Sequence, residues 1–268
     1  MSSRHPRTDS RARRPIVRIV ASLLLLGALA AAAAGVWYLF LRPAAPATVG
    51  FGAVPSASPA STSDATAEPT AEATIGSPTI GTADSLEGTW AVDGSIGSFD
   101  DFSGSFVGYR VREELAGIGA AEAVGRTPDV SGALTFEGTS VTSAEFTADL
   151  TTLRSDSSMR DGQLGRQGLE TDTFPTATFV LTQPIDLGTM PADGETFSAT
   201  AVGDLALHGV TRSVEIALEG RLTDGVVTVV GTLPILFGDY DIPTPESMRV
   251  LSIDENGTME FQLHFTRT

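Results

Sequence analysis

The sequence predicts an all-β protein, an antiparallel β-barrel of about eight strands with a short helical insertion, preceded by one transmembrane helix. Three observations lead to this expectation. From residue 89 onward, several segments alternate apolar and polar residues, as strands with one buried face do. Turn dipeptides separate these segments, and short turns join antiparallel strands. Ahead of them, a long apolar run follows a cluster of arginines.

The N-terminal part is typical of a membrane anchor. Residues 1–18 form a basic tail, and residues 19–41 form an apolar run that contains Ser22 as its one polar residue. A helix of this length extends about 34 Å, enough to cross a hydrocarbon core of about 30 Å. Cytoplasmic flanks carry the excess of basic residues, so we expect a single-pass cell-membrane protein with its N-terminus in the cytoplasm and its C-terminal domain outside. The arginines that precede the run are Arg4, Arg7, Arg11, Arg13, Arg14 and Arg18.

A cleaved signal peptide is the alternative for this segment. Residues 23–34 are apolar, and the small residues Ala30 to Ala32 would suit a signal peptidase. The apolar run continues through Val36–Leu41, however, and a cleaved protein would keep this apolar segment at its new N-terminus. This continuation favours an uncleaved anchor.

Residues 42–88 have the composition of a linker. They consist mainly of Ala, Pro, Ser, Thr and Gly, and no basic residue follows Arg42. Such a stretch buries too little apolar surface to offset the entropy lost on ordering it. We expect a disordered tether that holds the following domain away from the bilayer.

Residues 89–268 form the predicted barrel domain. With one apolar face per strand, closure into a barrel is favoured because it leaves no strand edge unpaired. Alternation is clearest in residues 107–112, 144–150, 197–207, 214–218 and 259–265. The turn dipeptides are Glu137-Gly138, Asp193-Gly194, His208-Gly209, Asp224-Gly225 and Asn256-Gly257.

Residues 157–171 are the one part of this domain that does not look like strand. Serines that suit a helix N-cap come first, and Gly162, Gly165 and Gly168 then weaken a regular helix. We therefore expect a short and partly irregular helix.

Composition excludes several functions. The chain has no cysteine, so disulfide scaffolds, thiol nucleophiles and Cys-ligated metals are ruled out. All 17 basic residues are arginines, and the net charge is −16. Because the positive charge gathers in residues 1–42, the remainder is strongly acidic, which does not suit nucleic-acid binding. We also expect the acidic domain to be repelled by anionic lipid head groups.

Four motifs resemble, in order and spacing, those of the YceI-like family. They are residues Trp90–Asp93, Arg160–Leu164, Thr173–Phe179 and Gly203–Arg212. The resemblance implies a lipocalin-like antiparallel barrel whose apolar lumen holds a polyisoprenoid chain, in the bacterial cell envelope. Two positions depart from the family pattern, because Asp93 is followed by Gly-Ser-Ile without a histidine, and Gln163 replaces a histidine. These departures bear on the identity of the ligand rather than on the barrel.

The apolar faces of the predicted strands supply the candidate ligand-binding residues of the lumen. The alternative for each of them is an ordinary packed core. The candidates are Val107, Tyr109, Val111, Phe136, Phe146, Phe179, Leu205, Ile216, Phe261 and Leu263.

Arg160 and Asp161 are the head-group candidates, with the Arg160 guanidinium suited to a pyrophosphate. The alternative is a neighbouring pair that pins the insertion. We expect His208 at a tight turn, His264 facing outward, and Arg110 paired on a solvated face with its neighbours Glu113 and Glu114.

No constellation of residues predicts catalysis, a metal site or a cofactor. The acids around Tyr240 are too few for a convincing cation site. The leading hypothesis is therefore a membrane-anchored extracytoplasmic protein that holds a polyisoprenoid or quinone-type lipid. The alternative is a non-enzymatic envelope interaction module with a fully packed barrel, which predicts no cavity larger than a few waters. A hydrolase or isomerase is the third possibility.

Overall fold

The computed structural model describes residues 45–51, 86–117, 119–244 and 250–268. It divides into two compact units, Met1–Ala45 and Pro46–Thr268, and the description below concerns the second. The expected membrane span at residues 19–41 and most of the expected linker lie outside the described residues. Within the described ranges, no helix is long and apolar enough to cross a membrane.

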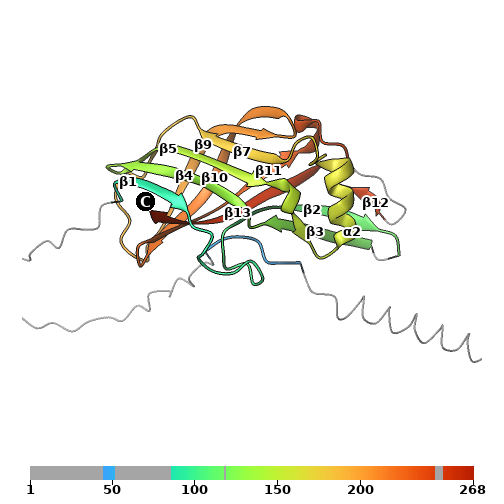
Figure 1. Ribbon diagram of the computed structural model, residues 1–268, viewed down its shortest axis with the longest axis horizontal. Coiled ribbons are helices and arrows are strands. Elements are labelled where there is room, and N and C mark those ends of the chain that lie inside the picture. Colours follow the sequence, from blue (N-terminus) through green and yellow to red (C-terminus); the bar gives the residue numbers. More distant parts are fainter. Residues whose placement is uncertain (1–44, 52–85, 118, 245–249) are drawn as a thin grey trace, which may run out of the picture. The chain divides into compact units, whose positions relative to one another are not determined.

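Eight antiparallel strands form a closed barrel, as the alternation predicted (Figure 1). The order around the wall is β1-β4-β5-β7-β9-β10-β11-β13, and β1 pairs with β13 to complete the circle. Trp90 lies opposite Arg267 and Val92 opposite Phe265 at this closure. The strands are β1 (Gly88–Val92), β4 (Val130–Glu137), β5 (Ser140–Asp149), β7 (Thr176–Leu181), β9 (Thr196–Leu207), β10 (Val210–Thr223), β11 (Val226–Leu236) and β13 (Asn256–Arg267).

The wall branches at β13. The C-terminal part of β13 pairs with β1, whereas Thr258 to Gln262 pair with β2 (Phe106–Leu115). Beyond β2, the sheet continues through β3 (Gly119–Thr127) to the short β6 (Arg154–Ser155). Two further short strands join the sheet at its margins, β12 (Val250–Ile253) on β2 and β8 (Ile185–Asp186) on β5.

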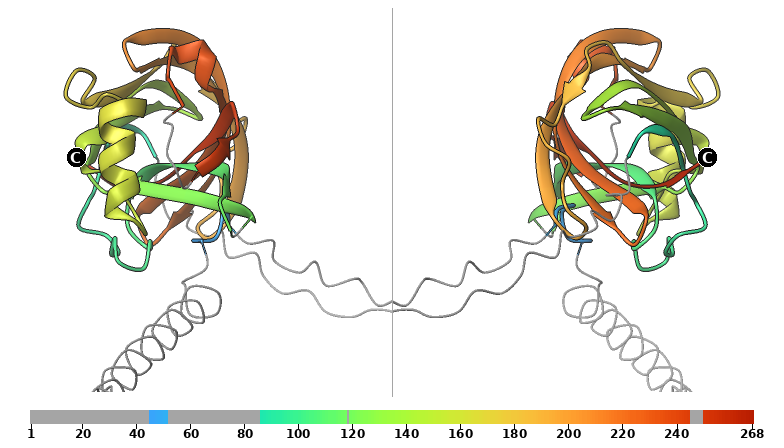
Figure 2. Two further views of the ribbon diagram at one scale, coloured as in Figure 1. Left: turned by 90° about the vertical axis from the view of Figure 1, so that its right-hand side faces the viewer. Right: turned by 90° about the vertical axis from the view of Figure 1, so that its left-hand side faces the viewer.

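The helical insertion lies between β6 and β7 and is short and irregular, as predicted. Its first part is α2 (Ser158–Gln163), which Ser157 caps, and its second part is a π-helical turn, η3 (Leu164–Gly168). Figure 2 shows α2 beside the strands at one end of the barrel. Two single-turn 3₁₀ helices complete the fold, η2 (Leu150–Thr152) and η4 (Phe237–Tyr240).

Three of the five predicted turn dipeptides lie in turns, and a fourth, Glu137-Gly138, is one residue early, because Glu137 ends β4 and the turn is Gly138–Thr139. At His208-Gly209 and Asp224-Gly225 both central residues have positive φ, as type I′ hairpin turns require. The prediction at Asn256-Gly257 was wrong, because these residues begin β13 and pair with Leu236 and Ile235 of β11. Gly257 is needed there for space, since a Cβ would lie 2.8 Å from a methyl carbon of Val111.

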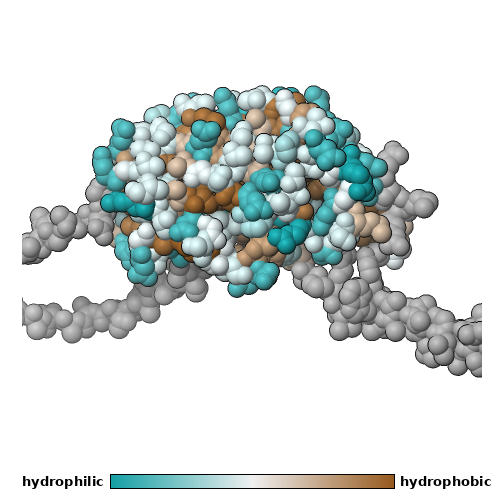
Figure 3. Space-filling model, in the orientation of Figure 1, coloured by the Kyte–Doolittle hydropathy of each residue, from teal (hydrophilic) through white to brown (hydrophobic). Residues whose placement is uncertain are grey.

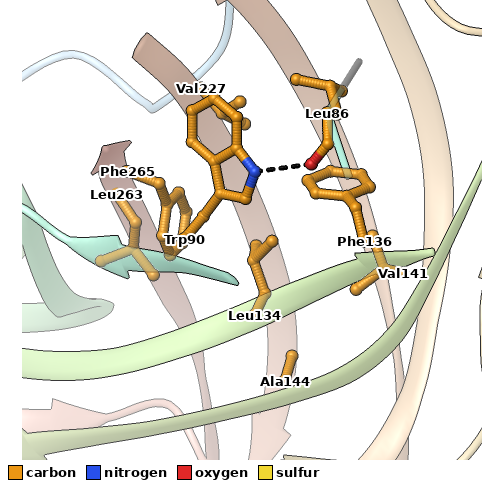
Figure 4. Packing of buried hydrophobic residues seen from close by; sticks show 9 residues of the cluster. All are labelled: Leu86, Trp90, Leu134, Phe136, Val141, Ala144, Val227, Leu263 and Phe265. Carbon is orange, nitrogen blue, oxygen red and sulfur yellow. Dashed lines mark hydrogen bonds between the residues drawn. The ribbon is translucent and has the colours of Figure 1, made fainter. Parts of the chain in front are cut away.

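An apolar cluster closes the barrel near β1 (Figure 4). The Trp90 indole donates a hydrogen bond to the carbonyl of Leu86 (2.7 Å), which satisfies its polar atom within the cluster. The rings of Trp90 and Phe136 meet edge to face at 6.4 Å. Leu86 is buried here, so the packed domain begins a few residues before the predicted start at 89.

A buried ion network lies on the outer side of β2, β3 and β13. Glu260 is 1% exposed and accepts hydrogen bonds from Arg126 (2.6 Å) and Arg110 (3.3 Å). The prediction that Arg110 pairs with Glu113 and Glu114 on a solvated face was wrong. Residues far apart in sequence bury it instead, including Pro46, whose carbonyl accepts a hydrogen bond from Arg110 (2.7 Å).

A two-compartment cavity as the candidate functional site

The barrel interior contains an apolar cavity of about 120 Å³. It is lined by inward-facing residues of the strands from β4 to β13, and every lining residue except Thr178 is apolar. A single water needs roughly 10–15 Å³ by the same measure, so this space corresponds to several waters. We call it the chain compartment.

Glycines in the wall give the aromatic rings of the chain compartment room to lie against the strands. Gly220 stands opposite Phe197 and Gly231 opposite Phe261 on paired strands. A Cβ on Gly220 would lie 2.1 Å from the Phe197 ring, and one on Gly231 would lie 2.5 Å from the Phe261 ring. Each ring lies over the glycine of the neighbouring strand, where any other residue would have its side chain. The rings therefore extend less far into the interior than they would beside a larger residue.

A second cavity of about 170 Å³ adjoins the first, and we call it the head compartment. Val107, Ala177 and Met259 line both cavities and so form the boundary between them. The wall of the head compartment comes from β2, the helical insertion, η4 and β12. Unlike the chain compartment, it contains ionisable side chains in its lining, namely Tyr109, Glu113 and Arg160.

Arg160 is already paired with carboxylates. Its Nη2 donates to Glu113 (2.8 Å), and its Nη1 donates to Asp156 one helical turn earlier. Glu113 is nearly buried, so the pair with Arg160 compensates a charge that would otherwise be costly. The guanidinium therefore reaches the cavity with its charge neutralised.

Tyr109 differs from Arg160 because its hydroxyl has no partner. The oxygen is buried and makes no hydrogen bond within the described part of the chain. Burial raises the pKa of Tyr109, so the side chain is an uncharged phenol at neutral pH. The ring lies across Gly125 on the neighbouring β3, where a Cβ would be 2.4 Å from a ring carbon.

Asp161 lines neither cavity. Its carboxylate accepts hydrogen bonds from the backbone N–H (3.0 Å) and hydroxyl (2.5 Å) of Ser155. It thus pins the insertion to β6, which was the alternative considered for the Arg160–Asp161 pair. Of the two head-group candidates, the structure brings only Arg160 to a cavity.

The ten candidate lumen residues all line this pair of cavities. Tyr109 and Val111 lie in the head compartment, Val107 lies at the boundary, and the others lie in the chain compartment. Contact of these residues with a ligand remains a prediction. Phe197 and Met259 were not among the candidates, although both continue an alternating pattern that the sequence shows. Glu113 was assigned to a solvated face, although the alternation of β2 places it on the same side as Tyr109 and Val111. Its pairing with Arg160 of the insertion has no signal in the sequence.

The two histidines of the barrel are structural and line neither cavity. His208 lies in the β9–β10 turn as predicted, and its ring nitrogens contact the Tyr240 carbonyl (3.0 Å) and the Glu170 carboxylate (3.1 Å). His264 is on the outer side of β13, but the loop at Ser103 covers it, with a ring nitrogen 2.8 Å from the Ser103 carbonyl. Among the described residues, no group of His, Asp and Glu is arranged to hold a metal ion.

A closed eight-stranded antiparallel barrel with an apolar interior places the protein among the lipocalin-like barrels. The YceI-like domain matches residues 90–265, which is most of the chain, and the protein therefore belongs to this family. The resemblance of the four sequence motifs is thereby confirmed. No curated protein sequence matches the chain.

Solved structures that are similar to the chain include two bacterial proteins of low sequence identity. One is a polyisoprenoid-binding domain from Saccharophagus degradans, implicated in plant cell wall breakdown (TM-score 0.52, 20% identity), and the match covers 67% of this chain and 98% of that chain. Another is BcnA from Burkholderia cenocepacia (TM-score 0.49, 21% identity), with 65% and 98% covered. The likeness to the Saccharophagus domain shows the fold alone.

Proposed function

We propose that the protein binds an isoprenoid lipid, with its hydrocarbon chain in the chain compartment. The observation that carries this proposal is the cavity itself, which is lined by strands of the barrel and by apolar side chains at every position except Thr178. Each CH₂ group moved there from water contributes about 0.8 kcal/mol. The name of the Saccharophagus domain, a polyisoprenoid-binding domain with the same fold, supports this class of ligand.

The alternative of a fully packed interaction module fits the interior less well. That alternative predicts no cavity larger than a few waters. The two adjoining spaces of about 120 and 170 Å³ exceed this limit. They favour a ligand-binding barrel over one filled by its own side chains.

Organic extraction of the purified protein followed by mass spectrometry tests the proposal directly. We expect an isoprenoid lipid to be recovered, or an added polyprenol to be taken up. Ala201→Leu should reduce uptake, because Ala201 lines the chain compartment and a larger side chain occupies it. Thr200→Leu is the matched control, since Thr200 is the adjacent exposed residue of β9. Absence of any lipid and equal behaviour of the two variants would refute the proposal.

We further propose that residues 19–41 anchor the protein and that the barrel lies on the outer side of the cell membrane. Support comes from the arginines that precede the apolar run and from the length of that run. Fractionation of cells that express the full chain tests this proposal. We expect the intact protein in the membrane fraction with its barrel open to external protease, and recovery of the barrel in the culture medium would contradict it.

A further inference from the structure

We propose that the head compartment selects an uncharged head group that carries a hydrogen-bond acceptor, and that it rejects a phosphate or pyrophosphate. The inference rests on the proposed function, because it concerns the polar end of a lipid whose chain occupies the adjoining compartment. It specifies the charge and hydrogen-bonding character of the lipid head group, which the apolar lumen does not determine.

The charges around the compartment disfavour an anion. Among the described residues that line it, Arg160 is the one cation, and Glu113 and Asp156 both pair with it. Asp161 follows Arg160 directly and adds a third negative charge nearby. A pyrophosphate placed here would have to displace a carboxylate from Arg160 while remaining close to the others. Like charges at close range repel each other, so the balance opposes binding.

Tyr109 favours a head group that can accept a hydrogen bond. Its hydroxyl is a donor that makes no hydrogen bond within the described residues, and a buried polar group without a partner is costly. A carbonyl or ether oxygen in the compartment would be its first acceptor. The phenol remains protonated at neutral pH because burial raises its pKa, and it therefore stays a donor.

The ligand test uses three probes with one tail and different heads: farnesene with no polar head, farnesylacetone with a ketone, and farnesyl pyrophosphate. Binding to the full-length chain is measured by competition against a fluorescent isoprenoid. We expect farnesylacetone to bind about fivefold to tenfold more tightly than farnesene, as one hydrogen bond allows. Farnesyl pyrophosphate should bind more weakly than either.

Two pairs of variants assign the effects to residues. Tyr109→Phe should abolish the advantage of farnesylacetone over farnesene. Tyr240→Phe should preserve it, because the buried hydroxyl of Tyr240 likewise makes no hydrogen bond to any described residue, but Tyr240 lines neither cavity. Glu113→Gln should strengthen the binding of farnesyl pyrophosphate by about tenfold, since it frees Arg160 from one carboxylate. Glu114→Gln, an equal charge change on an exposed neighbour, should not.

The outcomes separate this inference from the proposed function. If none of the three probes binds and no lipid co-purifies, the proposed function fails. If farnesyl pyrophosphate binds most tightly, the function stands and the inference is overturned. The inference is also overturned if Tyr109→Phe leaves the preference for the ketone unchanged.

Discussion

Glu260 lies on the outer side of β13, yet loop and strand residues bury it almost completely. Arg126, which donates to it, is covered in turn by the rings of Phe102 and Phe106, with its guanidinium carbon 4.4 and 4.2 Å from the ring centres. A buried carboxylate with two guanidinium partners is tolerated only while all three members are present. The network is thus sensitive to the loss of any one charge.

Glu260→Gln should lower the free energy of unfolding by about 3–5 kcal/mol, because among the described residues it leaves the buried Arg126 guanidinium without a carboxylate partner and leaves Arg110 with Glu122 alone. Urea denaturation measures the change. Glu215→Gln on the exposed side of β10 is the control and should change stability by less than about 0.5 kcal/mol. Equal effects of the two variants would show that the network contributes nothing specific.

Tyr109 should make stability depend on pH in the alkaline range. The phenol of the unfolded chain releases its proton near its ordinary pKa of 10.0, whereas burial raises the pKa in the folded state. The contribution of Tyr109 to stability is therefore complete below about pH 10 and is lost as the pH rises above it toward the folded pKa. Urea denaturation between about pH 9 and pH 11 should show a steeper decline for the wild type than for Tyr109→Phe. Parallel declines would contradict this expectation.

At the scale of elements, the pairing of wall glycines with aromatic rings keeps the chain compartment open. Gly231 and Phe261 are opposite residues of β11 and β13. The alternation of β13 in the sequence predicted an inward Phe261 correctly. The sequence could not show which glycine would lie opposite it. That depends on the register between β11 and β13, and local patterns in the sequence do not determine the register between two strands.

Gly231→Ala should push the Phe261 ring toward the lumen, since the new Cβ would lie 2.5 Å from a ring carbon. We expect less isoprenoid uptake and a loss of about 1–3 kcal/mol of stability from overpacking. Uptake of farnesylacetone and urea denaturation measure the two effects. Gly238→Ala is the control, because a Cβ at Gly238 meets no atom within 4 Å. Unchanged uptake in Gly231→Ala would argue against this role of the glycine.

The local structure of the helical insertion was also predictable from the sequence, whereas its contacts with the barrel were not. Its serine cap and its glycines are local signals, and they predicted a short irregular helix at residues 157–171. That the insertion covers the head compartment depends on contacts with β2, such as the ion pair between Arg160 and Glu113. The same contact explains why Glu113 was misplaced on a solvated face.

At the scale of the whole molecule, closure of the barrel depends on the last strand. Residues of hydrophilic or intermediate hydropathy cover most of the face seen in Figure 3, and hydrophobic residues form separate patches between them. Phe265, near the C-terminus of β13, is 1% exposed and packs with Phe146 at 5.6 Å between ring centres. This ring and the β1–β13 hydrogen bonds join the two ends of the sheet.

Removal of residues 265–268 should open the barrel, because it deletes the pairing of β13 with β1 and a fully buried ring. We expect a loss of at least about 3 kcal/mol, which includes the cost of removing a buried phenylalanine. Thermal unfolding followed by circular dichroism measures the effect. Removal of Thr268 alone is the control, since it costs two exposed hydrogen bonds to the Thr89 carbonyl, one from the backbone N–H and one from the hydroxyl. A cooperative transition at the wild-type temperature in the longer truncation would contradict the role of the closure.

The sequence by itself determined the fold class, the position of the irregular helix, most turns and the inward face of each tested strand. These features follow from side-chain period and from turn chemistry, both of which act between near neighbours in the chain. Only the tertiary structure decided that Glu260 is buried, that Glu113 neutralises Arg160, and that the lumen divides into two compartments. Those properties arise where residues distant in the sequence meet, such as Glu113 and Arg160, 47 positions apart, and Arg110 and Glu260, 150 positions apart. Local patterns carry no information about such meetings, because the closure of the barrel sets them.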